Sequence, residues 1–165
     1  YYHSLFLFLL FGRRWNEVRT LNWSDINLIE NKYTIRSENN KIGENQTYDL
    51  AVYIAKALQQ IQDDRNGLVF KSPITKKELY PPKVQLSKIR KKSNIQELTL
   101  HYFRHIFVSA MGEMGTATTV LSASLGHTNL QTVNEFYLSA NHEKSSKQAN
   151  DTIVELFQSN NSDRI

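Results

Sequence analysis

The sequence contains no cysteine, and only 3 prolines and 6 glycines occur among its 165 residues. Without cysteine the chain can form neither a disulfide bond nor a thiolate metal site, as is typical of proteins from a reducing cytoplasm. The longest apolar run, residues 5–11, is much shorter than the roughly 20 residues that cross a bilayer. It also lacks the features of a secretory signal. We therefore expect a buried helix there, no membrane partner and a cytoplasmic location.

The overall balance of residues fits one ordinary domain. Hydrophobic residues make up 40% of the chain, which is enough for a real core, and the formal net charge is +4. This mild basic excess favours a polyanionic partner without identifying one. The chain begins Tyr1-Tyr2, without an initiator methionine and inside a predicted helix, so we interpret it as a fragment of a longer protein.

Apolar periodicity and turn residues predict an α+β fold that is mainly helical with a small antiparallel sheet. Two β-prone runs, residues 32–37 and 46–51, flank a segment rich in turn formers and predict a hairpin. Residues 68–70 predict a third short strand. Helices are expected at residues 1–11, 14–21, 52–62, 100–113, 117–124, 130–136 and 143–157.

Residues 71–92 differ in character from the rest of the chain. All three prolines lie here, and eight basic residues stand against a single acid, Glu78. The eight are Lys71, Lys76, Lys77, Lys83, Lys88, Arg90, Lys91 and Lys92.

His101 and Arg104 lie three residues apart on a predicted helix, a spacing that puts both side chains on one face. A phosphodiester gains a second negative charge in its pentacoordinate transition state. An arginine fork matches two phosphate oxygens, and a histidine adds a donor or moves a proton. Taken alone, the pair is more often a surface arginine beside a half-buried histidine.

Arg14 begins another predicted helix and shares a face with Glu17, which can orient the guanidinium through a charge-assisted hydrogen bond. A solvated ion pair is the ordinary alternative for such a motif. The preceding residue is also an arginine, Arg13, so the sequence leaves some ambiguity over which of the two is functional. The spacing to Glu17 favours Arg14.

Three further side chains are candidates for chemistry. Lys41 stands at the predicted hairpin tip and could protonate a leaving oxygen, with Lys32 and Arg36 nearby as alternatives. His127 lies at a turn between two predicted helices, where capping is its ordinary role. Tyr137 has the side chain of a known covalent nucleophile, although most tyrosines at helix ends are packing residues.

The order of these residues resembles the signature of the tyrosine recombinases, a family that includes phage integrases, transposon integrases and chromosome-dimer resolvases. The matching segments are Gly12-x-Arg14-x-x-Glu17-x-x-x-Leu21-x-Trp23-x-Asp25, Leu100-His101-x-x-Arg104-His105 and Leu125-Gly126-His127 followed by Tyr137. Two features depart from the family's pattern. An apolar residue often occupies the place of Arg13, and the usual spacing from His127 would select Phe136, so we assign the adjacent Tyr137.

The resemblance implies the catalytic domain of a site-specific recombinase that needs no cofactor and no metal. In this mechanism Tyr137 attacks a DNA phosphorus and forms a 3′-phosphotyrosine, while Lys41 protonates the leaving 5′ oxygen. Arg14 and Arg104 hold the nonbridging oxygens, and His101 and His127 support them. His101 is also the candidate base for the tyrosine.

The resemblance also implies partners. Double-stranded DNA is the expected substrate, and residues 71–92 would contact its phosphates without reading sequence. We interpret residues 1–165 as the catalytic domain, with an N-terminal DNA-binding domain absent. Residues 141–165 form a C-terminal helix and tail that would pack on a neighbouring subunit of a homotetramer, or else fold back on its own domain.

Two other classes of function stay open. Residues 117–136, a helix, a turn at Gly126 and a helix, could form the helix-turn-helix of a non-enzymatic DNA-binding protein. That interpretation leaves the two arginine motifs unexplained. A type IB topoisomerase shares the same chemistry, but His127 and the compact length favour a recombinase.

Overall fold

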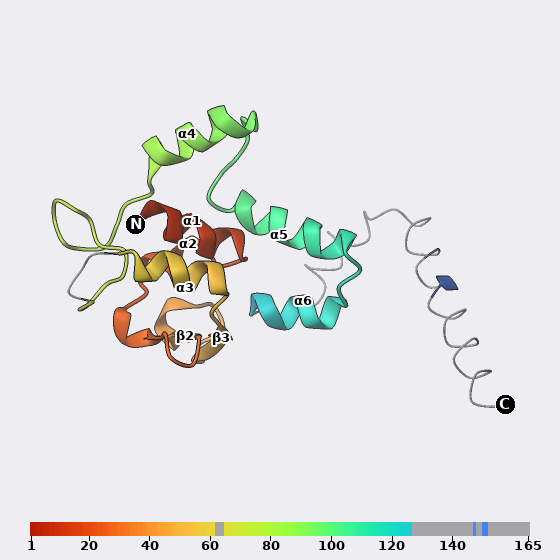
Figure 1. The fold of residues 1–165 in the computed structure, drawn as a ribbon, viewed down its shortest axis with the longest axis horizontal. Helices are drawn as coiled ribbons and strands as arrows, with labels where there is room; N and C mark the ends of the chain where they lie inside the picture. Colours follow the sequence, from red (N-terminus) through yellow and green to blue (C-terminus); the bar gives the residue numbers. More distant parts are fainter. Residues whose placement is uncertain (62–64, 127–146, 148–149, 152–165) are drawn as a thin grey trace.

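The computed structural model describes residues 1–61 and 65–126, together with residues 147, 150 and 151 (Figure 1). The predicted helices at 130–136 and 143–157 therefore lie outside the described residues or touch them only at single positions. The elements are, in order, α1 (Tyr2–Leu10), α2 (Trp15–Arg19), the 3-10 helix η1 (Trp23–Asp25), β1 (Ile26–Asn27), β2 (Lys32–Ile35), the 3-10 helix η2 (Ser37–Asn39), β3 (Gln46–Asp49), α3 (Val52–Gln59), α4 (Lys83–Ser93), α5 (Tyr102–Glu113) and α6 (Thr118–Leu125).

Helix α1 forms the centre of the core and confirms the buried helix expected from the apolar run. Leu5, Phe8 and Leu9 on this helix have no exposed surface. The helix packs against α2, α3 and α5, which cover most of its apolar side chains and leave Leu10 exposed. The ring of Phe8 meets Tyr33 of β2 and Phe70 edge to face, with centroids 5.2 and 6.0 Å apart.

The sheet has three antiparallel strands in the order β1-β2-β3, and the predicted hairpin supplies two of them. Side chains of β2 alternate between the two faces, and its Tyr33 and Ile35 point into the core. Tyr33 is paired with Tyr48 of β3, and their rings stack with centroids 5.6 Å apart.

The predicted strand at residues 68–70 is wrong, because the third strand is residues 26–27. Residues 68–70 instead run beside the segment before η1. The amide of Val69 donates to the carbonyl of Leu21 at 2.9 Å, and Leu68 forms an isolated bridge with Asn22. Val69 and Phe70 are fully buried, so their apolar character reflects core packing more than strand pairing.

Helix α4 occupies the second half of the basic stretch, where the sequence pattern indicated no helix. It begins directly after Pro82 and ends at Asn94, which has the left-handed backbone conformation (φ 57°) that stops helices. Leu86 is its one buried residue. The dense positive charge hides this narrow apolar contact in the sequence.

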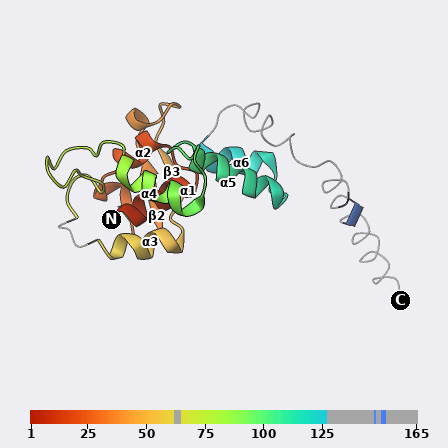
Figure 2. The same cartoon turned by 90° about the horizontal axis from the view of Figure 1, so that it is seen from above.

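Helices α5 and α6 lie side by side at one side of the molecule, and α5 packs against α1 (Figures 1 and 2). Helices α5 and α6 share a small core of Val108, Leu121 and Leu125. Helix α5 begins at Tyr102 with His101 at its N-cap, and the amide of Tyr102 donates to Thr99 Oγ1 at 3.1 Å. Within the part of the chain that the structure describes, no helix is long and apolar enough to cross a membrane.

The turn after α1 depends on Gly12, and replacing it tests this junction. Gly12 has φ +86°, and an added Cβ would lie 2.8 Å from Leu125 Cδ2 and 3.1 Å from Phe107 Cδ1. We expect Gly12→Ala to lower the free energy of unfolding by about 1–2 kcal/mol for the left-handed backbone and by roughly 1–3 kcal/mol more for overpacking. Denaturant unfolding measures the loss.

Gly67→Ala is the matched control, because Gly67 also has positive φ (+67°) but an added Cβ would meet nothing within 4 Å. Only the backbone cost of about 1–2 kcal/mol should remain there. Equal losses in the two variants would show that α6 does not press on the end of α1.

Candidate active site

In the motif Leu100-His101-x-x-Arg104-His105, the most buried cation is Arg104 on α5, which is 4% exposed. Its Nη2 donates to the carbonyl oxygen of Leu125 at 2.9 Å, and its Nη1 donates to the carbonyl oxygen of Gly12. These carbonyls lie at the ends of α6 and α1, where helices leave acceptors without internal partners. Burial lowers the pKa of Arg104 to about 9, so the group stays cationic at neutral pH.

Arg14 is held by the buried carboxylate of Glu17. Its Nη1 donates to Glu17 Oε1 at 2.8 Å, and its backbone amide donates to Glu17 Oε2 at 2.9 Å. The Glu17 side chain is 3% exposed and that of Arg14 is 24% exposed. The pair is therefore not a solvated surface ion pair, and part of the guanidinium remains open to a ligand.

Arg13 takes a different direction from its neighbour. It is 2% exposed, and its Nη2 donates to the carbonyl oxygen of Ser124 near the end of α6. Its guanidinium carbon lies 3.9 Å from the centroid of the Tyr48 ring on β3. The two consecutive arginines thus occupy separate environments, one inside the protein and one at its surface.

His101 lies directly before α5, and both burial and the charges of other candidate groups lower its pKa. Burial lowers the pKa of His101 below its ordinary value of 6.5, and the positive charges of His105, Arg104, Arg14 and Lys41 lower it further. The ring of His105 is perpendicular to it, with centroids 4.8 Å apart. Arg104, Arg14 and Lys41, from three distant segments, therefore lie within electrostatic range of His101, and the lowered pKa favours a neutral imidazole at neutral pH.

The loop that carries Lys41 is organised by the side chain of Asn40. Its amide group donates to the carbonyl oxygens of Arg36 and Glu44 at 2.9 and 2.8 Å. Its Oδ1 accepts from the next turn of backbone, including the amide of Ile42 at 2.8 Å. These bonds shape the loop while the Lys41 side chain stays exposed.

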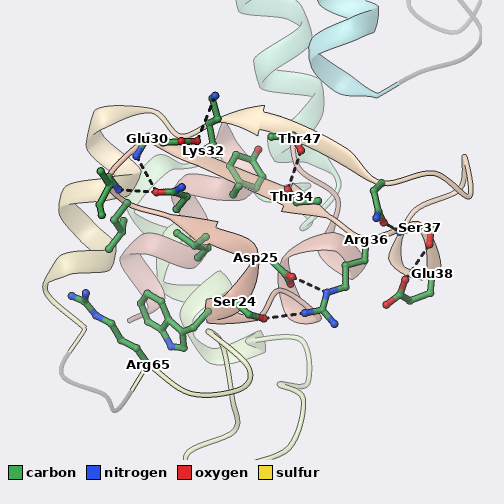
Figure 3. A pocket seen from close by; sticks show the side chains of 17 residues that line it. Ser24, Asp25, Glu30, Lys32, Thr34, Arg36, Ser37, Glu38, Thr47 and Arg65 are labelled. Carbon is green, nitrogen blue, oxygen red and sulfur yellow. Dashed lines mark hydrogen bonds and ion pairs between the residues drawn. The ribbon is translucent and has the colours of Figure 1, made fainter.

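The alternatives to Lys41 are engaged elsewhere. Lys32 pairs with Glu30 at 3.6 Å. Arg36 donates through Nε to Asp25 at 2.7 Å and through Nη2 to Ser24 at 3.0 Å, on the wall of an open hollow of about 920 Å³ (Figure 3). The hollow is separate from the candidate site, because it is not lined by Arg14, Lys41, His101 or Arg104.

The predicted DNA-contacting residues fall on a loop and on α4. The backbone of Lys71 forms an isolated antiparallel β-bridge with Glu78, whose side chain pairs with Arg19 of α2. On α4, Arg90 turns inward and donates to the carbonyl of Leu98 at 2.6 Å. The exposed members of the eight are Lys76, Lys77, Lys83, Lys88, Lys91 and Lys92. Their role at DNA stays a prediction.

Two predicted catalytic residues, His127 and Tyr137, lie outside the described residues, as does nearly all of the C-terminal segment 141–165. His127 directly follows Gly126, the last described residue of this part of the chain. Among the described residues, no three His, Asp or Glu side chains gather as metal ligands would. The sequence analysis did not predict the contact of Arg13 with Tyr48. The feature that could have indicated it is the basic residue at position 13, where an apolar residue is usual in the family's pattern.

Several solved structures share this fold. The Tn1549 transposon integrase, in complex with transposon right end DNA, has a TM-score of 0.72 at 16% identity, covering 92% of this chain and 58% of that one. XerA recombinase has a TM-score of 0.64 at 24% identity, with 88% and 54% covered. The catalytic domain of bacteriophage HP1 integrase has a TM-score of 0.61 at 22% identity, covering 88% of this chain and 79% of that one. This chain thus spans just over half the length of the first two.

Among curated protein sequences, none matches this chain significantly. The sequence profile of the phage integrase family, in contrast, matches residues 2–144, which include both arginine motifs and the segment from Leu125 to Tyr137. The fold agrees with this match. The chain therefore belongs to the phage integrase family.

Proposed function

We propose that this chain is the catalytic part of a site-specific DNA recombinase that cuts and rejoins strands through a 3′-phosphotyrosine intermediate. The observation that carries the proposal is the placement of the two arginine motifs. Arg104 donates to the carbonyl of Gly12, two residues before Arg14, and both arginines lie within electrostatic range of His101, as does Lys41. A site with this much positive charge suits a phosphodiester. The transposon integrase of the same fold was solved with transposon end DNA, which supports DNA as the substrate.

The arginines supply charge stabilisation. Attack on the phosphorus creates a pentacoordinate state with additional negative charge on the nonbridging oxygens. Arg14 and Arg104 are each fixed by buried partners before DNA arrives, so they need little reorganisation when that charge develops. Glu17 orients Arg14 and remains outside the reaction.

Proton transfer completes the step. The hydroxyl of Tyr137 gives up its proton, its oxygen bonds to phosphorus, and the bond to the 5′ oxygen breaks. Lys41 delivers a proton to that oxygen, while neutral His101 is the candidate acceptor for the tyrosine proton. Attack by another strand's 5′-hydroxyl reverses each change, so no external energy source is required.

Double-stranded DNA and further copies of the chain complete the proposed assembly. Residues 71–92 provide phosphate contacts, and the helix at 143–157 docks on a neighbouring subunit in a homotetramer. A non-enzymatic helix-turn-helix protein would have no use for a solvent-accessible Arg14 held by a buried Glu17. A topoisomerase-like enzyme is distinguished by product, since only a recombinase joins the cut end to a different strand.

The first test of this function is Tyr137→Phe in the full-length protein. The variant should bind DNA nearly as the unchanged protein does and form no covalent adduct, because only the nucleophilic hydroxyl is removed. A nicked suicide duplex that carries the DNA flanking the gene, run on a denaturing gel, detects the adduct. An adduct that persists in the variant would disprove the assignment, and peptide mapping would then identify the true nucleophile.

Arg14→Ala tests charge stabilisation at the site. Loss of one donor that strengthens in the transition state should lower the single-turnover cleavage rate roughly 10²- to 10³-fold while DNA affinity changes little. Arg19→Ala is the matched control, since Arg19 ends the short helix α2 that Arg14 caps and also pairs with a glutamate, Glu78. Equal rates for the two variants would remove Arg14 from the mechanism.

The exposed lysines of α4 predict the salt dependence of DNA binding. Changing Lys88, Lys91 and Lys92 to Gln should weaken binding to all duplexes alike, because these side chains would neutralise phosphates without reading bases. The slope of log K against log salt should become shallower by about 0.9 for each phosphate that the variant no longer neutralises. Changing Lys32, Lys56 and Arg65 to Gln controls for net charge, because these three cations are exposed and lie outside residues 71–92. An unchanged slope in the α4 variant would place α4 away from DNA.

A further inference from the structure

Arg13 sits inside the contact between α6 and strand β3. In Figure 1 the end of α6 nearest β3 is its C-terminal end. The guanidinium reaches both elements, because Nη2 donates to the Ser124 carbonyl and the guanidinium carbon lies over the Tyr48 ring, 3.9 Å from its centroid. One side chain between α1 and α2 thus joins two segments that are far from it in sequence.

The end of α6 rests directly on β3 at this point. A Cβ added to Gly126 would lie 2.3 Å from Tyr48 Oη and 2.6 Å from Gln46 Oε1, so the backbone approaches as closely as glycine allows. Tyr48 is itself fixed, since its hydroxyl donates to Gln46 Oε1 at 2.8 Å and its ring stacks on Tyr33.

A buried cation is a costly way to fill such a space. Nε and Nη1 of Arg13 are buried and have no hydrogen-bond partner among the described residues. An apolar side chain of similar volume would avoid that desolvation, as the usual family residue does. What the arginine adds is direction, because a planar fork on a carbonyl and a flat face on an aromatic ring fix orientation as well as distance.

The two joined elements both lead to candidate catalytic residues. Strand β3 closes the hairpin that carries Lys41, and the chain leaving α6 reaches His127 one residue after Gly126. We propose that Arg13 is a positioning residue, which fastens the end of α6 to β3 and so fixes the point from which the chain continues to His127. The link to His127 rests on the proposed recombinase function, whereas the fastening of α6 does not.

Hydrogen exchange tests the fastening without any assay of activity. In Arg13→Met, which keeps length but not charge, amides of residues 122–126 should exchange faster by about tenfold while those of α1 and α3 keep their protection. Arg13→Lys, which keeps the charge, should recover part of that protection. Unchanged exchange at residues 122–126, or protection in Met equal to or above that in Lys, would reduce Arg13 to a space-filling residue and overturn the proposal.

A double-mutant cycle in the full-length protein tests the link to His127. Arg13→Met should slow single-turnover cleavage between roughly tenfold and 10²-fold with DNA affinity unchanged, as expected for a displaced catalytic group. In a His127→Asn background the same change should have almost no further effect. Additive losses would overturn the link. If the unsubstituted protein forms no covalent adduct with DNA, the proposed function is refuted instead. Hydrogen exchange would still decide the role of Arg13.

Discussion

The bonds from Arg104 to the carbonyls of Gly12 and Leu125 hold the site together. They require the ends of α1 and α6 to meet beside α5, and they satisfy acceptors that helix ends leave open. A buried guanidinium is stable here because both carbonyls carry the negative end of a helix dipole. Removing it would leave each carbonyl unsatisfied, at about 1–3 kcal/mol per group. The same junction fixes the turn that leads from α1 to Arg14.

Around that junction the protein concentrates positive charge before any anion is present. Arg14 and Arg104 each lower the pKa of His101, and Arg14 and Arg13 lower that of Arg104. The only carboxylate seen among these interactions of the described residues is Glu17, which is buried behind Arg14. Such repulsion lowers the stability of the free protein, and the phosphodiester of the proposed substrate would relieve it. Local strain of this kind is expected where function and stability compete.

The sequence alone predicted the parts of this molecule that obey strong local rules. The apolar run at 5–11, the hairpin around Lys41 and the helix of Arg104 follow from hydrophobic pattern and turn residues. The helix at 83–93 contacts the rest of the protein through one buried residue, Leu86, and Val69 is placed by a backbone hydrogen bond to Leu21. Such tertiary contacts leave no periodic pattern in the local sequence. The orientation of Arg13 is of the same kind, since nothing beside it in sequence indicates Tyr48 or Ser124 as its partners.

The described site divides its groups by function. The arginines that would stabilise charge are fixed by buried partners, Glu17 for Arg14 and two carbonyls for Arg104. Lys41 and His101, which would move protons, are exposed at a hairpin tip and at a helix start. Charge stabilisation benefits from rigid donors, because reorganisation at the moment of reaction costs energy. Proton transfer needs groups that can approach a departing or entering oxygen. Rigid charge donors with exposed proton carriers are therefore the arrangement that a phosphoryl transfer without metal demands of these side chains.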